Sequence, residues 1–385
     1  MKNMKKIIGL VLAVLMMASL LSACGKQKPA AEQNANAAQQ VADTAEQIAN
    51  NEEKEISTRE FTDDCGRTVT LPTEITRMAI SGPLTQIYTL PLELDSGILV
   101  GCAAQFSNDL GKYIPESFKD LPELGQLYGG KGTMDKEALL AANPQVVLDV
   151  GEAKGDIVSD LDALTEQTGI PFVHIDATTE TAPEAYRRIG ELIGDSEKTE
   201  ELAAWCENCL ADIKEIMEKV DADGARKTLL YCLGDKGLNV LAENSYHADT
   251  LKIVAKNVAD IEDVVPTGAG NEVDMEQLII WNPEVIIFEP NSIYSEVGND
   301  AAWQQMQAIA SGNYYKTPQG PYGWLQSPPS VQRYLGLLWL TSLLYPEYTD
   351  YDLYEKVSEY YKLFYDYDLT PEVYNELTAD SLPKQ

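Results

Sequence analysis

The 385-residue sequence is poor in the residues and motifs on which catalysis depends. It contains only two histidines, His174 and His247, and it has no G-x-S-x-G, H-E-x-x-H or Walker motif. His174 lies within an apolar run typical of a buried strand, whereas His247 lies in a more polar stretch and is the better ligand candidate. We therefore expect no enzymatic activity, no resident cofactor and no metal centre.

Basic residues are also scarce. Lysine and arginine together number 29, against 61 aspartates and glutamates, and the formal net charge is −32 at pH 7. Binding to the phosphates of nucleic acids requires clustered basic side chains, so we expect no nucleic-acid partner. A strongly acidic surface suits a soluble domain that stays monomeric outside a cell.

The N-terminus carries the one long apolar run, and it has the order of a secretory signal. Three lysines precede an apolar stretch over residues 7–20, and Leu-Ser-Ala-Cys then ends at Cys24. This ending resembles the bacterial lipobox, whose cysteine is acylated. We expect residues 1–24 to be a lipoprotein signal peptide, Cys24 to be the lipid anchor, and residues 25–58 to be a flexible tether outside the cytoplasmic membrane.

Five cysteines remain beyond the lipobox, and an odd number leaves at least one thiol unpaired. Cys206 and Cys209 form a C-x-x-C pattern, but it lies within a strongly helical stretch with no second pair or histidine beside it. That context favours structural cysteines or a local disulfide over a zinc or redox site. The sequence leaves the pairing open.

The most informative pattern is an internal repeat. Residues 134–148 (MDKEALLAANPQVVL) recur without a gap as residues 273–287 (VDMEQLIIWNPEVII). Each copy is typical of a short capped helix, an Asn-Pro stop and a buried β-branched strand. A unit used twice suggests two similar α/β lobes with a ligand cleft between them.

Strand and helix patterns alternate through both halves, which predicts a mostly parallel sheet in each. Ordered structure should begin with a hairpin over residues 60–71, and a long helix over residues 195–220 should separate the two copies of the repeat. We expect strands at residues 78–81, 98–103, 146–150, 172–176, 228–232 and 285–288. The predicted parts are an N-terminal lobe (59–180), connecting helices (181–222) and a C-terminal lobe with closing helices (223–385).

Ligands of open α/β sheets bind beyond the carboxyl ends of the strands, and this rule selects particular loops. Aromatic side chains in such loops stack on bulky ligands, and an arginine near the start of a late helix meets an anionic ligand or a carboxylate of its own lobe. The candidate ligand-binding residues are Gly82, Pro83, Gln86, Tyr128, His247, Tyr294, Tyr322, Trp324 and Arg333. For each of them the alternative is a packing role.

Acidic residues occupy matched positions in the two repeat copies. Asp135 and Asp274 are typical helix N-caps, and Glu137 and Glu276 follow in the first helical turn. Favourable interaction with the helix dipole explains the residue type. Matched negative points, one on each lobe, also suit docking onto a symmetric pair of arginine sites on a membrane dimer.

These features together carry a family resemblance. After the lipobox and the tether comes TDDCGRTVTLP over residues 62–72, and residues 328–340 (PPSVQRYLGLLWL) resemble the late helix of the family named next. The chain resembles the substrate-binding proteins of ABC importers for iron-siderophores, haem and vitamin B12, over roughly residues 61–346. The resemblance implies an α/β fold of two Rossmann-like lobes joined by one long helix. It also implies that an ABC permease dimer with its ATPase is the partner, engaged through Glu137 and Glu276.

The resemblance leaves the cargo open. Siderophore binders often place arginines in the cleft, and Arg333 is one of few candidates here; haem binders often offer a histidine or tyrosine, for which His247, Tyr246 or Tyr322 would serve. We expect an iron-siderophore or related metal chelate, with haem, a corrinoid or molybdate/tungstate as alternatives. A surface metalloenzyme on the same fold, or an adhesin-like lipoprotein, is the alternative of another class.

Overall fold

The structure is a computed structural model that describes residues 57–105, 111–127, 133–326 and 328–383. The predictions for the signal peptide, the Cys24 anchor and the tether lie outside these residues, apart from the last two residues assigned to the tether, and so does the predicted ligand contact of Tyr128. Within the described ranges, no helix combines the length and the apolar character needed to cross a membrane.

The N-terminal lobe opens with the predicted hairpin. Strands β1 (Thr58–Thr62) and β2 (Thr68–Pro72) pair antiparallel, and the Asp63 carboxylate accepts a hydrogen bond from the Arg67 amide to close the turn. A parallel sheet of order β3-β4-β5 follows. Its strands and the helices of this lobe are β3 (Met78–Ile80), α3 (Pro83–Ser96), η1 (Gly111–Tyr113), α4 (Glu116–Lys119), α5 (Lys136–Ala142), β4 (Val146–Gly151), α6 (Ile157–Thr168) and β5 (Phe172–Asp176).

The strand predicted at residues 98–103 is wrong. This segment forms only isolated bridges, from Leu99 to Met78 and from Cys102 to Glu123. The backbone changes partner along its length, because the Val100 amide donates to the Met78 carbonyl and the Cys102 amide donates to Pro122. Apolar content predicted burial correctly, but a strand also requires a continuous ladder with one neighbour.

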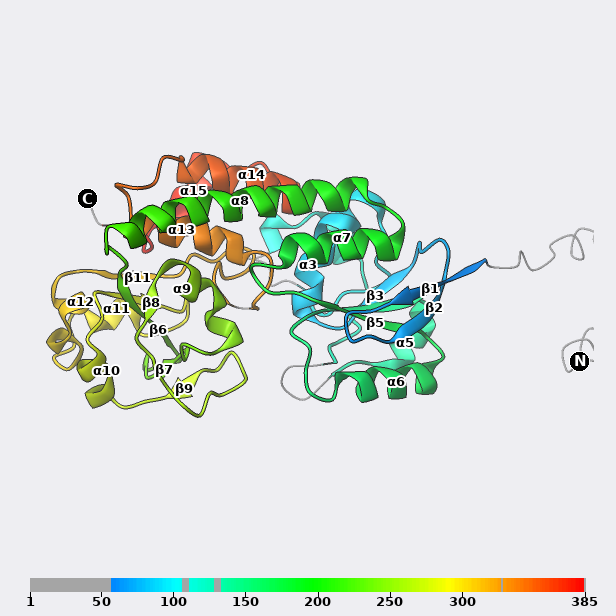
Figure 1. The fold of residues 1–385 in the computed structure, drawn as a ribbon, viewed down its shortest axis with the longest axis horizontal. Helices are drawn as coiled ribbons and strands as arrows, with labels where there is room; N and C mark the ends of the chain where they lie inside the picture. Colours follow the sequence, from blue (N-terminus) through cyan, green and yellow to red (C-terminus); the bar gives the residue numbers. More distant parts are fainter. Residues whose placement is uncertain (1–56, 106–110, 128–132, 327, 384–385) are drawn as a thin grey trace, which may run out of the picture. The chain divides into compact units, whose positions relative to one another are not determined.

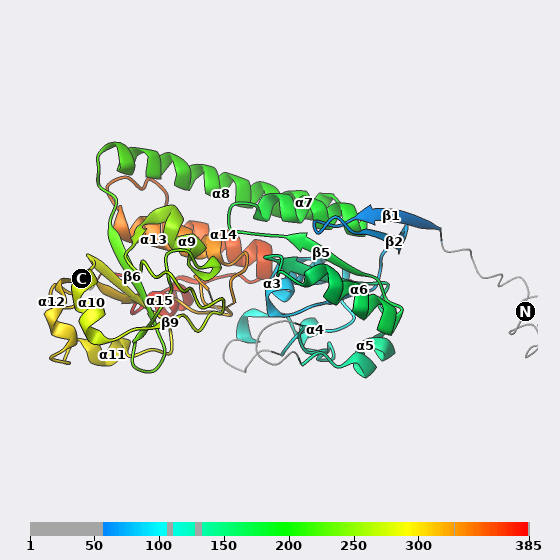
Figure 2. The ribbon, with the colours of Figure 1, turned by 60° about the horizontal axis from the view of Figure 1, so that its bottom comes forward.

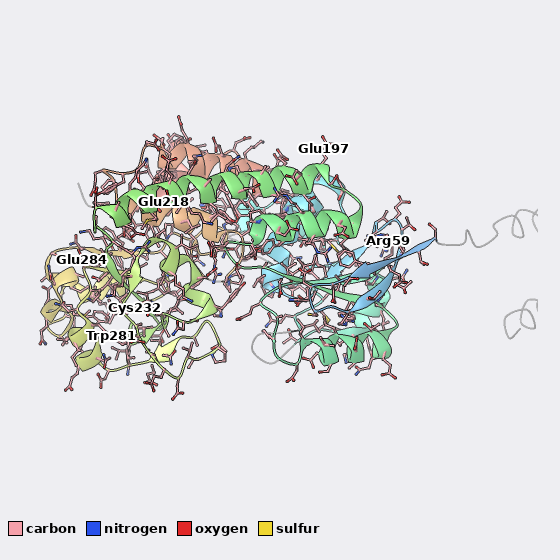
Figure 3. All side chains as sticks on the ribbon, in the orientation of Figure 1. Arg59, Glu197, Glu218, Cys232, Trp281 and Glu284 are labelled. Carbon is pink, nitrogen blue, oxygen red and sulfur yellow. The ribbon has the colours of Figure 1, made fainter. Side chains whose placement is uncertain are left out.

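Two helices connect the lobes: α7 (Ala182–Ile193) and α8 (Glu197–Ala222). The 26 residues of α8 span about 39 Å at roughly 1.5 Å per residue. Figures 1 and 2 show α8 running along both lobes, with α13 (Arg333–Leu344) and α14 (Leu353–Tyr365) beside it. Figure 3 shows the exposed Glu197 and Glu218 near the two ends of α8. The face of α8 that is turned away from solvent belongs to the largest hydrophobic core.

The C-terminal lobe is built on a six-stranded sheet of order β11-β10-β6-β7-β9, with β8 paired to β6. Strands β6, β10 and β11 run parallel, and β7 and β9 join antiparallel. The elements of this lobe are β6 (Thr228–Leu233), β7 (Asn239–Val240), η2 (Tyr246–Ala248), α9 (Asp249–Val254), β8 (Lys256–Asn257), β9 (Asn271–Glu272), α10 (Met275–Trp281), β10 (Val285–Phe288), α11 (Tyr294–Val297), η3 (Trp303–Gln305), α12 (Gln307–Ala310), β11 (Tyr314–Lys316), α13, α14 and α15 (Pro371–Thr378).

The repeat has the same local structure in both lobes. Asp135 accepts hydrogen bonds from the amides of Glu137 and Ala138 at the start of α5, and Asp274 accepts one from Gln277 at the start of α10. Both helices end at an asparagine in the left-handed region, Asn143 at φ 47° and Asn282 at φ 37°. The predicted fold, two Rossmann-like α/β lobes joined by one long helix, is confirmed.

Candidate functional site

A cleft of about 610 Å³ lies where the two lobes face each other. The N-terminal lobe contributes the residues that follow β3 and β4, and the C-terminal lobe contributes the loop around η2 and the residue after β10, in agreement with the rule for open α/β sheets. The lining residues are Ser81, Gly82, Pro83, Leu84, Thr85, Gln126, Asp149, Val150, Gly151, Glu152, Lys154, Tyr246, His247, Pro266, Thr267, Gly268, Glu289, Gln326, Pro328 and Pro329.

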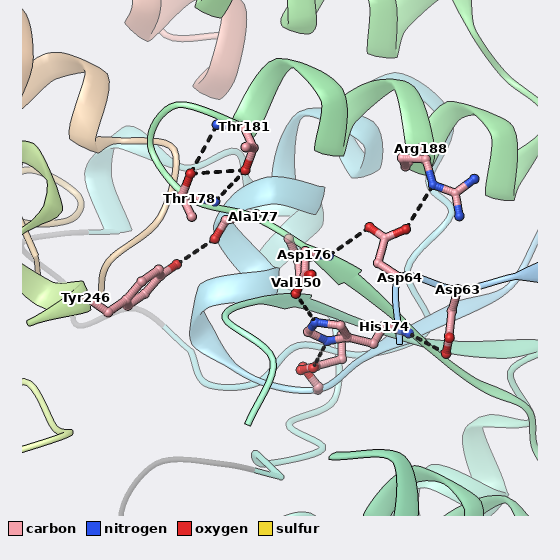
Figure 4. A network of polar contacts seen from close by, with 12 residues as sticks. Asp63, Asp64, Val150, His174, Asp176, Ala177, Thr178, Thr181, Arg188 and Tyr246 are labelled. Atoms are coloured by element: carbon pink, nitrogen blue, oxygen red, sulfur yellow. Dashed lines mark hydrogen bonds and ion pairs between the residues drawn. The ribbon is translucent and has the colours of Figure 1, made fainter. Parts of the chain in front are cut away.

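The N-terminal wall is organised around Asp149, near the end of β4. Its carboxylate accepts hydrogen bonds from the Ser81 hydroxyl and lies 2.7 Å from Nδ1 of His174. The other ring nitrogen of His174 lies 2.9 Å from Asp176, so the fully buried imidazole is held between two carboxylates (Figure 4). Burial alone would lower the pKa of His174, but the hydrogen bonds and charges of the two aspartates outweigh it and raise the pKa.

The C-terminal wall carries the other histidine. His247 Nδ1 lies 3.2 Å from Oε1 of Gln326, whose Nε2 lies 3.4 Å from Oε1 of Glu289. Burial and the nearby charge of Arg333 lower the pKa of His247 to about 4. The imidazole is therefore neutral at pH 7. With Nδ1 donating to Gln326, its Nε2 carries a lone pair that can accept a hydrogen bond or coordinate a metal.

Tyr246 ties the C-terminal lobe to the N-terminal lobe at the floor of the cleft. Its hydroxyl donates to the Ala177 carbonyl at 2.9 Å (Figure 4). Arg333 supports it from α13: the guanidinium lies 4.8 Å from the Tyr246 ring centroid and donates to the Tyr246 carbonyl at 2.7 Å. Arg333 also lies 3.5 Å from Thr179 Oγ1 and 3.7 Å from Asp249 Oδ2.

The segment after β5 is held at a second point as well. Thr179 donates its amide to Asp249 at 2.9 Å, and its carbonyl accepts a hydrogen bond from the Tyr334 hydroxyl at 2.8 Å. Both partners belong to the C-terminal lobe. Together with Tyr246 and Arg333, these contacts form a clamp between the lobes.

The charges of the cleft are mixed. Lys154 is the cationic side chain among the described lining residues, and Asp149, Glu152 and Glu289 are acidic. The N-terminus of α3 also faces the cleft, where Gly82 supplies no side-chain cap and the first turn has no acidic residue. Its backbone therefore adds partial positive charge to the N-terminal wall. The cleft presents both signs of charge and no arginine among its described lining residues.

The structure brings three of the predicted ligand residues to the cleft: Gly82, Pro83 and His247. Gln86 does not line it. The Gln86 side chain is buried and binds the backbone of Ala103 and Ala104, and its Nε2 lies 3.1 Å from the Tyr322 hydroxyl. The Tyr322 hydroxyl is correspondingly directed into the protein rather than into the cleft.

Three further candidates also lie outside the cleft lining. Trp324 is fully buried in the largest core, and Tyr294 packs against Phe288 and Tyr314 in the second core of the C-terminal lobe. Arg333 is 1 % exposed and acts in the clamp described above. Loop position suggested Trp324 and Tyr294, but both side chains turn inward and complete the cores.

Sequence reasoning missed several lining residues. Asp149 is the only charged residue in the buried run of β4, and Glu289 is the first residue after β10. A charged residue at the carboxyl end of a buried strand could have predicted both as cleft residues. Gln326 and the Pro266–Gly268 loop carry no comparable signal. Their place depends on how the late loops pack.

The described residues contain no group of three or more histidine, cysteine or acidic side chains arranged to hold a metal ion. The five described cysteines are all free thiols. Cys206 and Cys209 are buried in α8, where desolvation raises the pKa of both thiols well above the usual value. The structure therefore has no disulfide between Cys206 and Cys209, and both are buried structural cysteines.

The two predicted docking glutamates are exposed on different lobes. Glu137 lies in the first turn of α5, and Glu276 lies in the first turn of α10. Figures 1 and 2 both show α5 and α10 on the sides of their lobes that face away from α8. No ion pair found among the described residues involves either glutamate.

Comparison with known proteins identifies the family. The family model described as "Periplasmic binding protein" matches residues 98–321, which is more than half of the chain. The chain belongs to this family. Periplasmic binding proteins are extracytoplasmic proteins that bind transported ligands, and they carry no cofactor. No curated protein sequence matches the chain.

Solved structures agree with the family. An ABC transporter solute binding protein from Sulfurospirillum deleyianum has a TM-score of 0.75 and 27% identity, covering 83% of this chain and 99% of that one. A periplasmic solute binding protein from Veillonella parvula has a TM-score of 0.67 and 22% identity, with 84% and 98% covered. The molybdate-bound protein MolA from Haemophilus influenzae has a TM-score of 0.62 and 22% identity, with 81% and 99% covered. The predicted resemblance to substrate-binding proteins of ABC importers is confirmed.

Proposed function

We propose that this periplasmic binding protein captures an iron-siderophore or a related metal chelate between its lobes and delivers it to the permease of an ABC importer. It is a carrier rather than an enzyme, and Cys24 anchors it to the bacterial membrane through a lipid. The observation that carries the proposal is the cleft between the lobes, which is lined by the neutral imidazole of His247 from the C-terminal lobe and by the start of α3, which has no side-chain cap.

The size of the cleft supports a bulky cargo. A volume of about 610 Å³ lies within the range of roughly 300–1,000 Å³ typical of sites that enclose a drug-sized ligand. A tetrahedral oxyanion such as molybdate or tungstate would occupy a small part of this space. A metal chelate, haem or a corrinoid uses it more fully.

The chemistry of the walls favours a chelate with little net charge. The α3 N-terminus and Lys154 suit an anionic part of the ligand, while the carboxylates of Glu152 and Glu289 suit a cationic part. His247 is oriented by Gln326, and a second partner that fixes the ring is typical of metal-binding histidines. A metal inside an organic chelate is a cargo that can use all of these groups.

The cargo is tested by native mass spectrometry of the protein purified from its source, with metal analysis of the same sample. Fluorescence titrations then compare ferric hydroxamate, ferric catecholate, haem, cobalamin and molybdate. We expect micromolar or tighter binding of a metal chelate and at least tenfold weaker binding by His247→Ala. Binding of molybdate alone would contradict the proposal and favour the oxyanion alternative.

We further propose that Glu137 and Glu276 dock the loaded protein onto arginines of the permease dimer. Charge reversal at both positions (Glu137→Arg with Glu276→Arg) should abolish uptake, because like charges then face each other across the interface. Ligand affinity should not change, since neither residue lines the cleft. The matched control is Glu197→Arg with Glu218→Arg, the same charge change on exposed residues of α8. Uptake that survives reversal at 137 and 276, or fails equally in the control, would refute this role.

A further inference from the structure

The described residues expose few large hydrophobic side chains. Only three of them are substantially open to solvent: Leu140 at 49 %, Val158 at 42 % and Ile280 at 74 %. Two of the three lie on the repeat helices, Leu140 on α5 and Ile280 on α10. The repeat helix of each lobe therefore carries one exposed aliphatic side chain, although the two positions are offset by one in the repeat, because Leu140 aligns with Ile279 and Ile280 with Ala141.

Each aliphatic side chain lies beside a glutamate. Leu140 is three residues after Glu137, and Ile280 is four residues after Glu276. Side chains spaced by three or four positions share one face of a helix. Each lobe thus presents a carboxylate and an aliphatic group about one helical turn apart. The helices that carry them, α5 and α10, lie on the sides of their lobes away from α8 (Figures 1 and 2).

We infer that Leu140 and Ile280 are the apolar anchors of the permease interface, each inserting beside the ion pair made by the neighbouring glutamate. This inference rests on the proposed docking through Glu137 and Glu276. The occupant is a two-fold symmetric membrane protein, whose halves each present a basic side chain next to an apolar pocket. A carboxylate–aliphatic pair on each lobe, spaced by three residues on α5 and by four on α10, supplies a patch for each half.

Physical chemistry explains why the pairing is useful. An exposed ion pair in water contributes little to affinity, because the solvent screens it. An aliphatic side chain that seals against the partner removes water from the rim of the ion pair and strengthens its electrostatic interaction. It also adds apolar burial of its own. The glutamates alone would provide orientation and a fast encounter, and the aliphatic anchors would extend the lifetime of the complex.

The test measures binding of the full chain to the importer's permease–ATPase complex, purified from the source organism and placed in lipid nanodiscs, without added cargo. We expect Leu140→Asn with Ile280→Asn to weaken binding by about tenfold or more, mainly through faster dissociation. Val158→Asn is the matched control, because it removes an exposed aliphatic group that lies outside the repeat helices. An unchanged dissociation rate in the double variant would overturn the inference, as would an equal loss in the Val158 control.

A second pair of variants separates this inference from the docking proposal. Glu137→Gln with Glu276→Gln removes both charges and keeps both aliphatic groups. Weaker association in this variant together with faster dissociation in the Leu140/Ile280 variant supports both statements. Unchanged binding in the glutamine variant refutes the glutamate docking, while the response of the aliphatic variant still decides whether Leu140 and Ile280 make contact.

Discussion

At the scale of single residues, the two histidines have opposite environments and should titrate far apart. Two carboxylates hold His174, and its pKa is raised, whereas burial and Arg333 lower the pKa of His247 to about 4. Because the chain has only these two histidines, their ring-proton NMR signals give a simple titration. We expect one signal to titrate near pH 4 and the other above pH 6.5, with His247→Gln removing the first. Two midpoints near 6.5 would contradict the described environments.

The same shifts predict opposite contributions to stability. The raised pKa of His174 means that its interactions stabilise the fold fully below about pH 6.5 and that this contribution is lost as pH rises through the raised value. His247 binds fewer protons in the folded chain than in the unfolded chain between about pH 4 and 6.5. Its contribution to the free energy of unfolding therefore falls as the pH falls through that window. Urea unfolding of wild type and His247→Gln at several pH values checks the sign.

Gly268 leaves the space in which the His247–Gln326 pair lies. A Cβ atom at this position would lie 3.0 Å from Gln326 Oε1 and 3.1 Å from His247 Cε1, so Gly268→Ala must displace one of them. We expect about tenfold weaker binding of the chelate recovered from the source, with little change in the thermal midpoint. Gly155→Ala is the control, since a Cβ there meets nothing within 4 Å. Equal affinities of the two variants for the chelate would show that His247 and Gln326 do not contact the ligand.

At the scale of helices and strands, the repeat separates a structural role from a docking role. Asp135 and Asp274 cap α5 and α10, whereas Glu137 and Glu276 are exposed. Asp135→Ala and Asp274→Ala should each lower the free energy of unfolding by about 1 kcal/mol, because amides at the helix start lose their acceptor. Glu137→Gln and Glu276→Gln should change it by less than about 0.5 kcal/mol. Chemical denaturation of the four variants distinguishes the roles, and equal losses would show that the glutamates also hold the helices.

Local patterns predicted most elements because their causes are local. The capped helix, the asparagine stop and the buried strand of each repeat are each determined by adjacent residues. The apolar residues of α8 keep helical spacing over its 26 residues. The predicted strand at 98–103 failed because its hydrogen-bond partners come from two distant segments. The burial of Trp324 and Tyr294 could not be predicted for the same reason, because a loop sequence does not determine whether its large side chains point into the core or into the cleft.

At the scale of the whole molecule, the duplicated unit and the connecting helix were enough to predict two lobes and a cleft. The rule that ligands bind at the carboxyl ends of strands selected Gly82 and Pro83, and the polar stretch around His247 selected that residue; all three line the cleft. Arg333 was predicted to meet an anionic ligand or a carboxylate of its own lobe, and the structure places it 3.7 Å from Asp249 of that lobe, within the clamp. Its clamp partners Tyr246, Asp249 and Thr179 lie more than eighty residues away and become neighbours only through the complete fold.

We expect the angle between the lobes to depend on the side chains of the clamp as well as on α8. Arg333→Met leaves the Tyr246 carbonyl without its buried donor and removes the cation near Asp249, so we expect a loss of about 3 kcal/mol in the free energy of unfolding. Tyr246→Phe loses only the hydrogen bond to Ala177, which is worth about 1 kcal/mol. Arg187→Met is the control, because Arg187 makes surface ion pairs with Glu200 and Glu207 and should cost less than about 1 kcal/mol.

Distances between spin labels on α6 and α10 test the mechanical consequence. If the clamp fixes the lobes, Tyr246→Phe should broaden the distance distribution and Arg333→Met should broaden it further, because each removes part of the link between Ala177–Thr179 and the C-terminal lobe. The Arg187→Met control should keep the narrow distribution. An unchanged distance distribution in Arg333→Met would mean that α7 and α8 alone hold the lobes, and that the clamp does not restrict their relative motion.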